Sequence, residues 1–170
     1  KPRGYFRIEH PNAIYRLIES DCPVQFELPQ FALIERVSGP CGSDSSCCFN
    51  IAYPTMNARW LVTYIKIDES GLDPLVEQAH NTAFAHDIKA SGIGRKRFSF
   101  PENDVHGVLF ELDGPVASPL QFFATDSTNS FIRGALFFNH VPNPDSLSPS
   151  LEQVRENTIH LLETLEWKAQ

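Results

Sequence analysis

The stretch PLQFFATDSTNSFIRGALFFN, residues 119–139, decides the fold because it predicts a hairpin at the centre of a sheet. Side chains alternate between the two faces of a strand, and apolar residues occupy both faces of the second half of this stretch, together with Arg133. Five polar turn formers, Asp126 to Ser130, separate the two halves, and their side chains can hydrogen bond to the nearby backbone. Because neither face of the second strand can be left in water, we expect other elements to cover the hairpin on both sides.

The rest of the chain predicts further antiparallel strands. Short alternating segments are separated by turn signals, and consecutive strands of this kind usually pair with each other. The expected strands are residues 5–8, 13–18, 24–28, 31–37, 49–53, 60–67, 95–100 and 105–112.

Two segments have the apolar spacing of amphipathic helices. The first runs from about Asp73, as the capping residue before Pro74, to residue 90. The second starts at Ser148-Pro149 and ends near Trp167, which we expect to anchor the helix on the sheet. Two helices and an antiparallel sheet that is apolar on both faces predict an α+β fold, specifically an α/β/α sandwich.

Length and charge restrict the class of protein. The 170 residues predict a single domain over residues 1–170, long enough to bury a core without a metal or a disulfide. The formal net charge of −7 argues against nucleic-acid binding, which requires a basic domain or stripe.

The sequence contains no apolar run long enough to span a bilayer. The chain starts at Lys1 and its one methionine is Met56, so we expect a mature segment whose targeting region was removed upstream.

Four cysteines, Cys22, Cys41, Cys47 and Cys48, lie in the first third of the chain without any Cys-x-x-Cys pair. Zinc sites and redox motifs usually need closely spaced pairs, so the even number predicts two disulfides in an oxidising compartment, with free buried thiols as the alternative. Because adjacent cysteines rarely pair with each other, two connectivities remain. The first choice is Cys22 with Cys48 and Cys41 with Cys47; the crossed alternative is Cys22 with Cys47 and Cys41 with Cys48.

Patterns that would carry chemistry are weak. The six histidines form no His-Glu-x-x-His motif, and there is no Gly-x-Ser-x-Gly elbow, although a triad built from separated residues stays open. Residues 92–97, Gly-Ile-Gly-Arg-Lys-Arg, follow a helix, whereas phosphate-binding glycines lie between a strand and the start of a helix. The 126–130 turn lacks the glycine and the final glutamate of a calcium loop. We therefore predict no catalytic residue, no cofactor and no metal.

Five residues are candidates for an interaction surface: Arg3, Tyr5, Arg7, Asp126 and Arg133. The first three form a basic and aromatic segment on an acidic protein, and such residues are enriched at interfaces, although an ordinary edge strand is the alternative. An arginine in an apolar strand is either paired with a carboxylate or presented to a ligand or partner, and we favour the pairing because buried charges are usually paired.

Several segments together resemble the gliding-motility lipoprotein GldD family of Bacteroidetes. They are KPRGYFRI (1–8), CPVQFELP (22–29), CFNIAYP (48–54), QFFATDSTNSFIRGALFFN (121–139) and HLLETLEW (160–167). The resemblance extends from Lys1 to Lys168, and its most specific parts are residues 1–8 and 121–139. The order of elements also resembles Mog1/PsbP-like domains.

The resemblance implies a non-enzymatic lipoprotein of the cell envelope that faces the periplasm and is anchored to the membrane by a lipidated cysteine upstream of Lys1. Its partners would be other envelope proteins of the gliding and type IX secretion machinery, with no nucleic acid and no metal. It also implies that Cys22 and Cys48 are the recurring cysteines and that Cys41 staples the 39–46 loop. The alternative is a periplasmic ligand-binding or hydrolytic domain with a site near Asp126 and Arg133.

Overall fold

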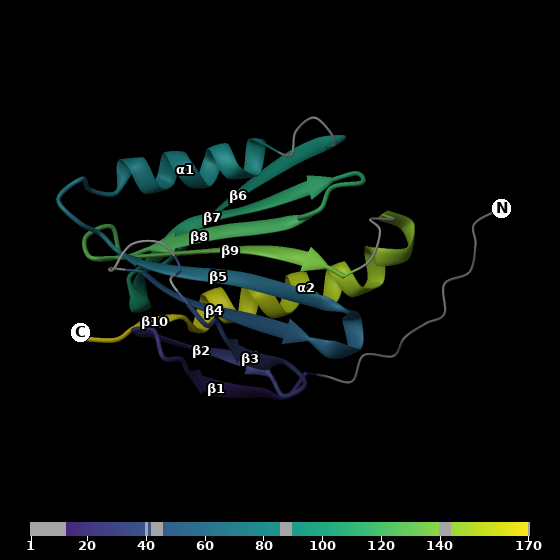
Figure 1. Ribbon diagram of the computed structural model, residues 1–170, viewed down its shortest axis with the longest axis horizontal. Coiled ribbons are helices and arrows are strands. Elements are labelled where there is room, and N and C mark those ends of the chain that lie inside the picture. The colour runs from purple at the N-terminus through teal and green to yellow at the C-terminus, as the bar shows by residue number, and fades with distance from the viewer. Residues whose placement is uncertain (1–12, 40, 42–45, 86–89, 140–143, 170) are drawn as a thin grey trace.

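A seven-stranded antiparallel sheet forms the centre of the protein (Figure 1). The computed structural model describes residues 13–39, 41, 46–85, 90–139 and 144–169, with the side chains of 144–148 left out. In order across the sheet the strands are β3 (Leu33–Arg36), β4 (Ser46–Tyr53), β5 (Ala58–Lys66), β9 (Ser130–Phe138), β8 (Leu120–Thr125), β7 (Val105–Asp113) and β6 (Gly92–Phe100). The 119–139 stretch is the β8–β9 hairpin, and each of its strands has a neighbour on both sides, as the sequence predicts.

Both faces of the large sheet are covered. Helix α1 (Asp73–Phe84) packs on one face, and α2 (Pro144–Thr164) packs on the other (Figure 1). The second face also carries a three-stranded sheet in the order β1 (Tyr15–Glu19), β2 (Val24–Pro29) and β10 (Glu166–Trp167). The fold is therefore the expected α+β sandwich, with a small sheet added to one outer layer.

The alternation along β9 separates two hydrophobic cores. Ile132 and Leu136 point into the larger core, which α2 and the small sheet close. Phe131 points to the opposite face and packs with Ala79 and Ala83 of α1. Alternate residues of one strand therefore contribute to both cores, which explains why the second half of the hairpin is apolar on both faces.

Two hairpins of the large sheet turn in the same way. A 3-10 turn, Pro54–Met56, joins β4 to β5, and another, Pro101–Asn103, joins β6 to β7. Each turn ends on a residue in the left-handed region, Asn57 with φ 53° and Asp104 with φ 52°. Asn and Asp adopt this conformation more readily than other non-glycine residues, so the two short polar residues fit the two turns.

The helix boundaries differ from the sequence prediction. Leu72 rather than Asp73 occupies the N-cap position of helix α1, without a side-chain capping hydrogen bond, and the helix ends at Phe84 rather than at residue 90. Helix α2 begins at Pro144, four residues before the predicted start, and continues through Pro149. A proline in the second turn removes one backbone donor, and packing of the rest of the helix on the sheet can offset that loss. None of the described helices is long and apolar enough to cross a membrane.

Trp167 does not extend the helix but lies in β10, where it pairs with Val24 of β2. Its indole Nε1 donates a hydrogen bond to the backbone oxygen of Asp104, 2.9 Å away. The residue therefore links the small sheet to the β6–β7 turn of the large sheet. The strand expected at residues 5–8 lies outside the described residues.

Candidate functional site

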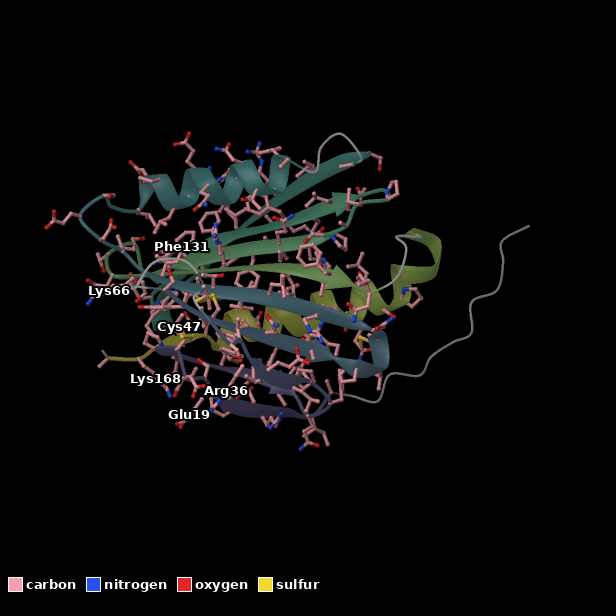
Figure 2. The ribbon with its side chains drawn as sticks, in the orientation of Figure 1. Glu19, Arg36, Cys47, Lys66, Phe131 and Lys168 are labelled. Carbon is pink, nitrogen blue, oxygen red and sulfur yellow. A yellow bond between two sulfur atoms is a disulfide. The ribbon has the colours of Figure 1, made fainter. Side chains whose placement is uncertain are left out.

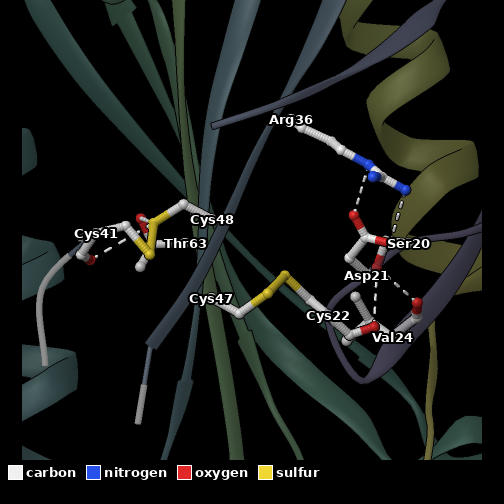
Figure 3. The surroundings of a disulfide bond; sticks show 9 residues. All are labelled: Ser20, Asp21, Cys22, Val24, Arg36, Cys41, Cys47, Cys48 and Thr63. Carbon is white, nitrogen blue, oxygen red and sulfur yellow. Dashed lines mark hydrogen bonds and ion pairs between the residues drawn. A yellow bond between two sulfur atoms is a disulfide. The ribbon is translucent and has the colours of Figure 1, made fainter. Parts of the chain in front are cut away.

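Two disulfides lie on opposite faces of β4 (Figure 3). Cys22 pairs with Cys47 and Cys41 pairs with Cys48, so the first-choice connectivity is wrong and the crossed alternative is the observed one. Cys47 and Cys48 are neighbours in a strand and must point to opposite faces. Cys22 lies beside the small sheet on the α2 side, whereas Cys41 lies on the other side, so only the crossed pairing brings the sulfur atoms together.

The Cys22–Cys47 disulfide joins the small sheet to the large one. An ion pair reinforces this junction, with Nε of Arg36 2.9 Å from Oδ2 of Asp21 (Figure 3). At the same end of the small sheet, Nζ of Lys168 lies 3.9 Å from Oε1 of Glu19, and both residues are labelled in Figure 2. The Arg36–Asp21 pair is largely exposed and the Lys168–Glu19 pair is partly exposed, so the disulfide is the stronger connection between the sheets.

Asp126 closes the β8–β9 turn. Its Oδ1 accepts hydrogen bonds from the backbone N–H groups of Thr128, Asn129 and Ser130 at 2.9, 2.8 and 2.9 Å. Between them, Ser127 has a positive φ of 71°. The carboxylate oxygen is already used by the turn, which agrees with a hairpin turn rather than a calcium loop.

Arg133 is half-buried on the α1 side of β9, opposite Thr63 of β5 and Phe123 of β8. Burial lowers the pKa of its guanidinium below the ordinary value. The carboxylate partner that we expected for it is not found among the described residues. Arg133 and Asp126 are not in contact there, and neither lines any of the four described pockets. Arg3, Tyr5 and Arg7 lie outside the described residues.

The largest of these four pockets is a groove of about 780 Å³ between α1 and strands β6, β7 and β8. Its walls combine apolar side chains with cationic and other polar ones. The lining residues are Leu72, Val76, His80, Arg95, Arg97, Phe98, Ser99, His106, Gly107, Val108, Phe123 and Thr125. We name this the α1–β6 groove.

Sequence reasoning missed the two arginines of the α1–β6 groove. Residues 92–97 are not a phosphate loop, because Gly92 begins β6 and no helix follows. A signal was nevertheless present: Arg95 and Arg97 are two apart in a strand and so lie on one face. What the sequence does not show is that α1 lies above that face and closes the other wall.

A hydrogen-bonded chain of three side chains lies at the rim of this groove. Oγ of Ser99 is 2.9 Å from Nδ1 of His106, and Nε2 of His106 is 3.2 Å from Oδ1 of Asp104. This is the residue set of a serine hydrolase, assembled across the β6–β7 hairpin. The His106 and Asp104 side chains are 40% and 67% exposed, so water weakens the electrostatic support that a buried triad gives its serine.

The described part of the chain contains no group of three or more His, Cys, Asp or Glu side chains that could hold a metal ion.

A cluster of ion pairs around Glu111 connects β7 with α2 and β6. Oε1 of Glu111 in β7 accepts a hydrogen bond from Nε of Arg155 in α2 at 2.5 Å and lies 3.4 Å from Nζ of Lys96. Partial burial raises the pKa of Glu111, but Arg155 and Lys96 outweigh it, and the net pKa is lowered.

Comparison with known proteins gives one family and one fold. A family model described as gliding motility lipoprotein GldD matches residues 1–167. No curated protein matches the chain. Among solved structures, the solution structure of cyanobacterial PsbP (CyanoP) from Synechocystis sp. PCC 6803 is similar, with a TM-score of 0.53 and 8% identity over 98% of this chain and 99% of that one. At this identity the similarity shows the fold alone, and it confirms the predicted resemblance to PsbP-like domains.

Proposed function

Because the chain belongs to the gliding motility lipoprotein GldD family, we propose that it serves the gliding and type IX secretion machinery through protein–protein contact and catalyses no reaction. The family match over residues 1–167 is the observation that carries this proposal. It assigns an accessory lipoprotein of gliding motility that is anchored in the cell envelope. The contact mechanism, the link to secretion and a periplasm-facing position are our proposals.

Two disulfides support the envelope location. Disulfides persist in oxidising compartments such as the periplasm and are rare in the cytosol. Cys22–Cys47 and Cys41–Cys48 use all four cysteines of the chain. A domain that must stay folded outside the cytosol benefits from such cross-links, because they restrict the unfolded state.

The experiment is a crosslinking pull-down from native envelopes with the full-length lipidated protein. It compares the intact protein with the triple variant Arg3→Ala/Tyr5→Ala/Arg7→Ala. A matched control, Leu33→Ala/Arg36→Ala/Lys66→Ala, removes two exposed cations and one exposed apolar side chain elsewhere. We expect gliding or secretion proteins with the intact protein and the control but fewer with the N-terminal variant. Failure to recover any such protein with intact protein would overturn the proposal.

The Ser99–His106–Asp104 chain supports a second candidate function, a serine hydrolase. The site predicted from the sequence for this alternative lies near Asp126 and Arg133, and Thr125, which precedes Asp126, lines the same groove as Ser99 and His106. A fluorophosphonate probe tests it, because such probes react with activated serine hydroxyls. Labelling of the intact protein that is lost in Ser99→Ala would favour the hydrolase; the absence of labelling would favour the contact role.

A further inference from the structure

The α1–β6 groove carries a pair of arginines with no carboxylate partner in the described chain. Arg95 and Arg97 are exposed and lie on the α1 face of β6. The guanidinium carbon of Arg95 lies 5.4 Å from the centre of the Phe84 ring, a cation–π contact that leaves its N–H groups free to bind an anion. Neither arginine forms an ion pair with a described residue.

The structure describes ten Lys and Arg side chains. Five of them lie beside carboxylates: Arg36 with Asp21, Arg59 with Glu35, Lys96 with Glu111, Arg155 with Glu111 and Lys168 with Glu19. Acidic residues outnumber basic ones by 21 to 14 in this chain. Arg95 and Arg97 are among the cations without a carboxylate and lie two residues apart on one face of β6, so they form a local cationic pair that attracts anions on an otherwise acidic protein.

The floor of the groove is apolar. In the register of the sheet, Arg97 lies next to Val108, and Val108 lies next to Phe123, so two apolar side chains continue the row that starts at the arginine. Val76 of α1 and Leu72, which immediately precedes the helix, form the facing wall. A ligand that fits this groove therefore combines anionic groups with apolar ones. One carboxylate is close to the rim, that of Asp104, and it is held by His106.

Strand β6 is also the last strand of the seven-stranded sheet. Its nine residues pair with β7 on one side, and no described strand pairs with the other side. In an antiparallel pair every second residue directs its N–H and C=O away from the partner strand. The outer side of β6 therefore offers backbone groups to an extended chain.

We propose that the α1–β6 groove and the free edge of β6 bind an extended acidic segment of a partner protein, which adds to the sheet beside β6 and places its carboxylates on Arg95 and Arg97. This inference deepens the proposed function and rests on it, because it names the surface and the partner chemistry of the protein contact. Backbone pairing supplies affinity, and the arginines select acidic side chains over basic ones. Charged side chains on an edge strand also discourage aggregation, but that role requires neither a groove nor an apolar floor.

The test is a binding measurement with the full chain and a fluorescein-labelled eight-residue peptide that alternates Glu and Val. The same peptide with Lys in place of Glu serves as the negative probe. We expect Arg95→Gln/Arg97→Gln to weaken binding by about tenfold or more, since charge-assisted hydrogen bonds are lost. The matched control Arg36→Gln/Lys66→Gln also removes two exposed cations but leaves the groove intact, and we expect less than about a twofold change. Circular dichroism verifies that both variants fold.

Two further readouts separate the outcomes. We expect the Glu peptide to slow hydrogen exchange at alternate backbone amides of β6, which free glutarate at the same carboxylate concentration should not do. Equal weakening by both double variants would overturn the proposal, as would tight glutarate binding without protection of β6, which would indicate a small-anion site. In the envelope pull-down, recovery of the same partners by Arg95→Gln/Arg97→Gln would contradict partner binding at the α1–β6 groove. It would leave the proposed role in protein–protein contact intact.

Discussion

Gly134 of β9 lies directly opposite Phe122 of β8, and the Phe122 ring occupies the space that a side chain at 134 would need. A Cβ built at Gly134 would lie 2.6 Å from Cε1 of Phe122 and 3.1 Å from Cε3 of Trp60. The Trp60 and Phe122 rings meet edge to face, with their centres 5.2 Å apart. The central hairpin therefore depends on one residue without a side chain.

Gly134→Ala should destabilise the protein by about 1–3 kcal/mol, because the added methyl group overpacks the core between two aromatic rings. Urea denaturation monitored by tryptophan fluorescence measures the change. The matched control is Gly94→Ala in β6, where the nearest atom to an added Cβ is 3.7 Å away. We expect the control to change the free energy of unfolding by less than about 0.5 kcal/mol. Equal effects of the two substitutions would contradict the overpacking argument.

The cysteine connectivity can be tested by counting thiols. Cys22→Ala/Cys47→Ala removes one observed disulfide and should leave no free thiol, because Cys41 and Cys48 still pair. Cys22→Ala/Cys48→Ala removes half of each disulfide, and its remaining Cys41 and Cys47 should both react with Ellman's reagent under denaturing conditions. Free thiols in the first variant and none in the second would instead support the first-choice connectivity, Cys22 with Cys48 and Cys41 with Cys47.

The two disulfides should differ in their effect on stability. The bonded cysteines are 25 residues apart in Cys22–Cys47 and 7 apart in Cys41–Cys48. The chain-entropy model then gives about 3.5 kcal/mol for the longer loop and about 2.4 kcal/mol for the shorter one. Guanidinium denaturation of the variants Cys22→Ala/Cys47→Ala and Cys41→Ala/Cys48→Ala measures both values, and a larger loss from the second variant would show that loop entropy is not the main effect.

Glu111 should stabilise the protein in a pH-dependent way. Its pKa in the folded state is below the ordinary 4.5, so its contribution is present above that pH and is lost as the pH falls through the folded-state pKa. Glu111→Gln should cost about 1–2 kcal/mol at pH 7, the usual value for a hydrogen bond to a charged group, and less near pH 3. Urea denaturation at both pH values tests this. Glu152→Gln is the control, since Glu152 is an exposed partner of Arg155 at 3.7 Å and should have little effect.

Asp126 offers a test that separates a turn role from a contact role. Asp126→Ala removes the acceptor of three backbone hydrogen bonds and should destabilise the protein by about 1–2 kcal/mol. Asp126→Asn keeps an acceptor oxygen and should recover most of that stability. If Asp126 also belongs to an interaction surface through its charge, Asp126→Asn should fold normally but recover fewer partners in the pull-down. Normal recovery would limit the residue to the turn.

Much of the architecture follows from local rules that the sequence displays. Alternation along residues 131–138 predicts a strand covered on both faces, and Ile132 and Phe131 do enter different cores. The amphipathic helix predicted to start near Asp73 is present as α1, with Ala79 and Ala83 buried, although it ends at Phe84 rather than near residue 90. Helix α2 starts earlier than Pro149 suggests, because a single missing backbone donor does not prevent a helix that packs on a sheet.

The sequence by itself determined the alternating strand of residues 49–53, and the structure extends that strand back to Ser46, so that Cys47 and Cys48 point to opposite faces. Only the tertiary structure decided which partner each of these cysteines has. Cys22 and Cys41 approach β4 from opposite faces, so Cys22 bonds to Cys47 and Cys41 bonds to Cys48. The same limit applies to the α1–β6 groove. Spacing places Arg95 and Arg97 on one side of a strand, but a groove also requires α1, which the chain brings there through long-range packing. Short-range periodicity is encoded residue by residue, whereas the meeting of layers depends on the apolar surface that the whole chain buries.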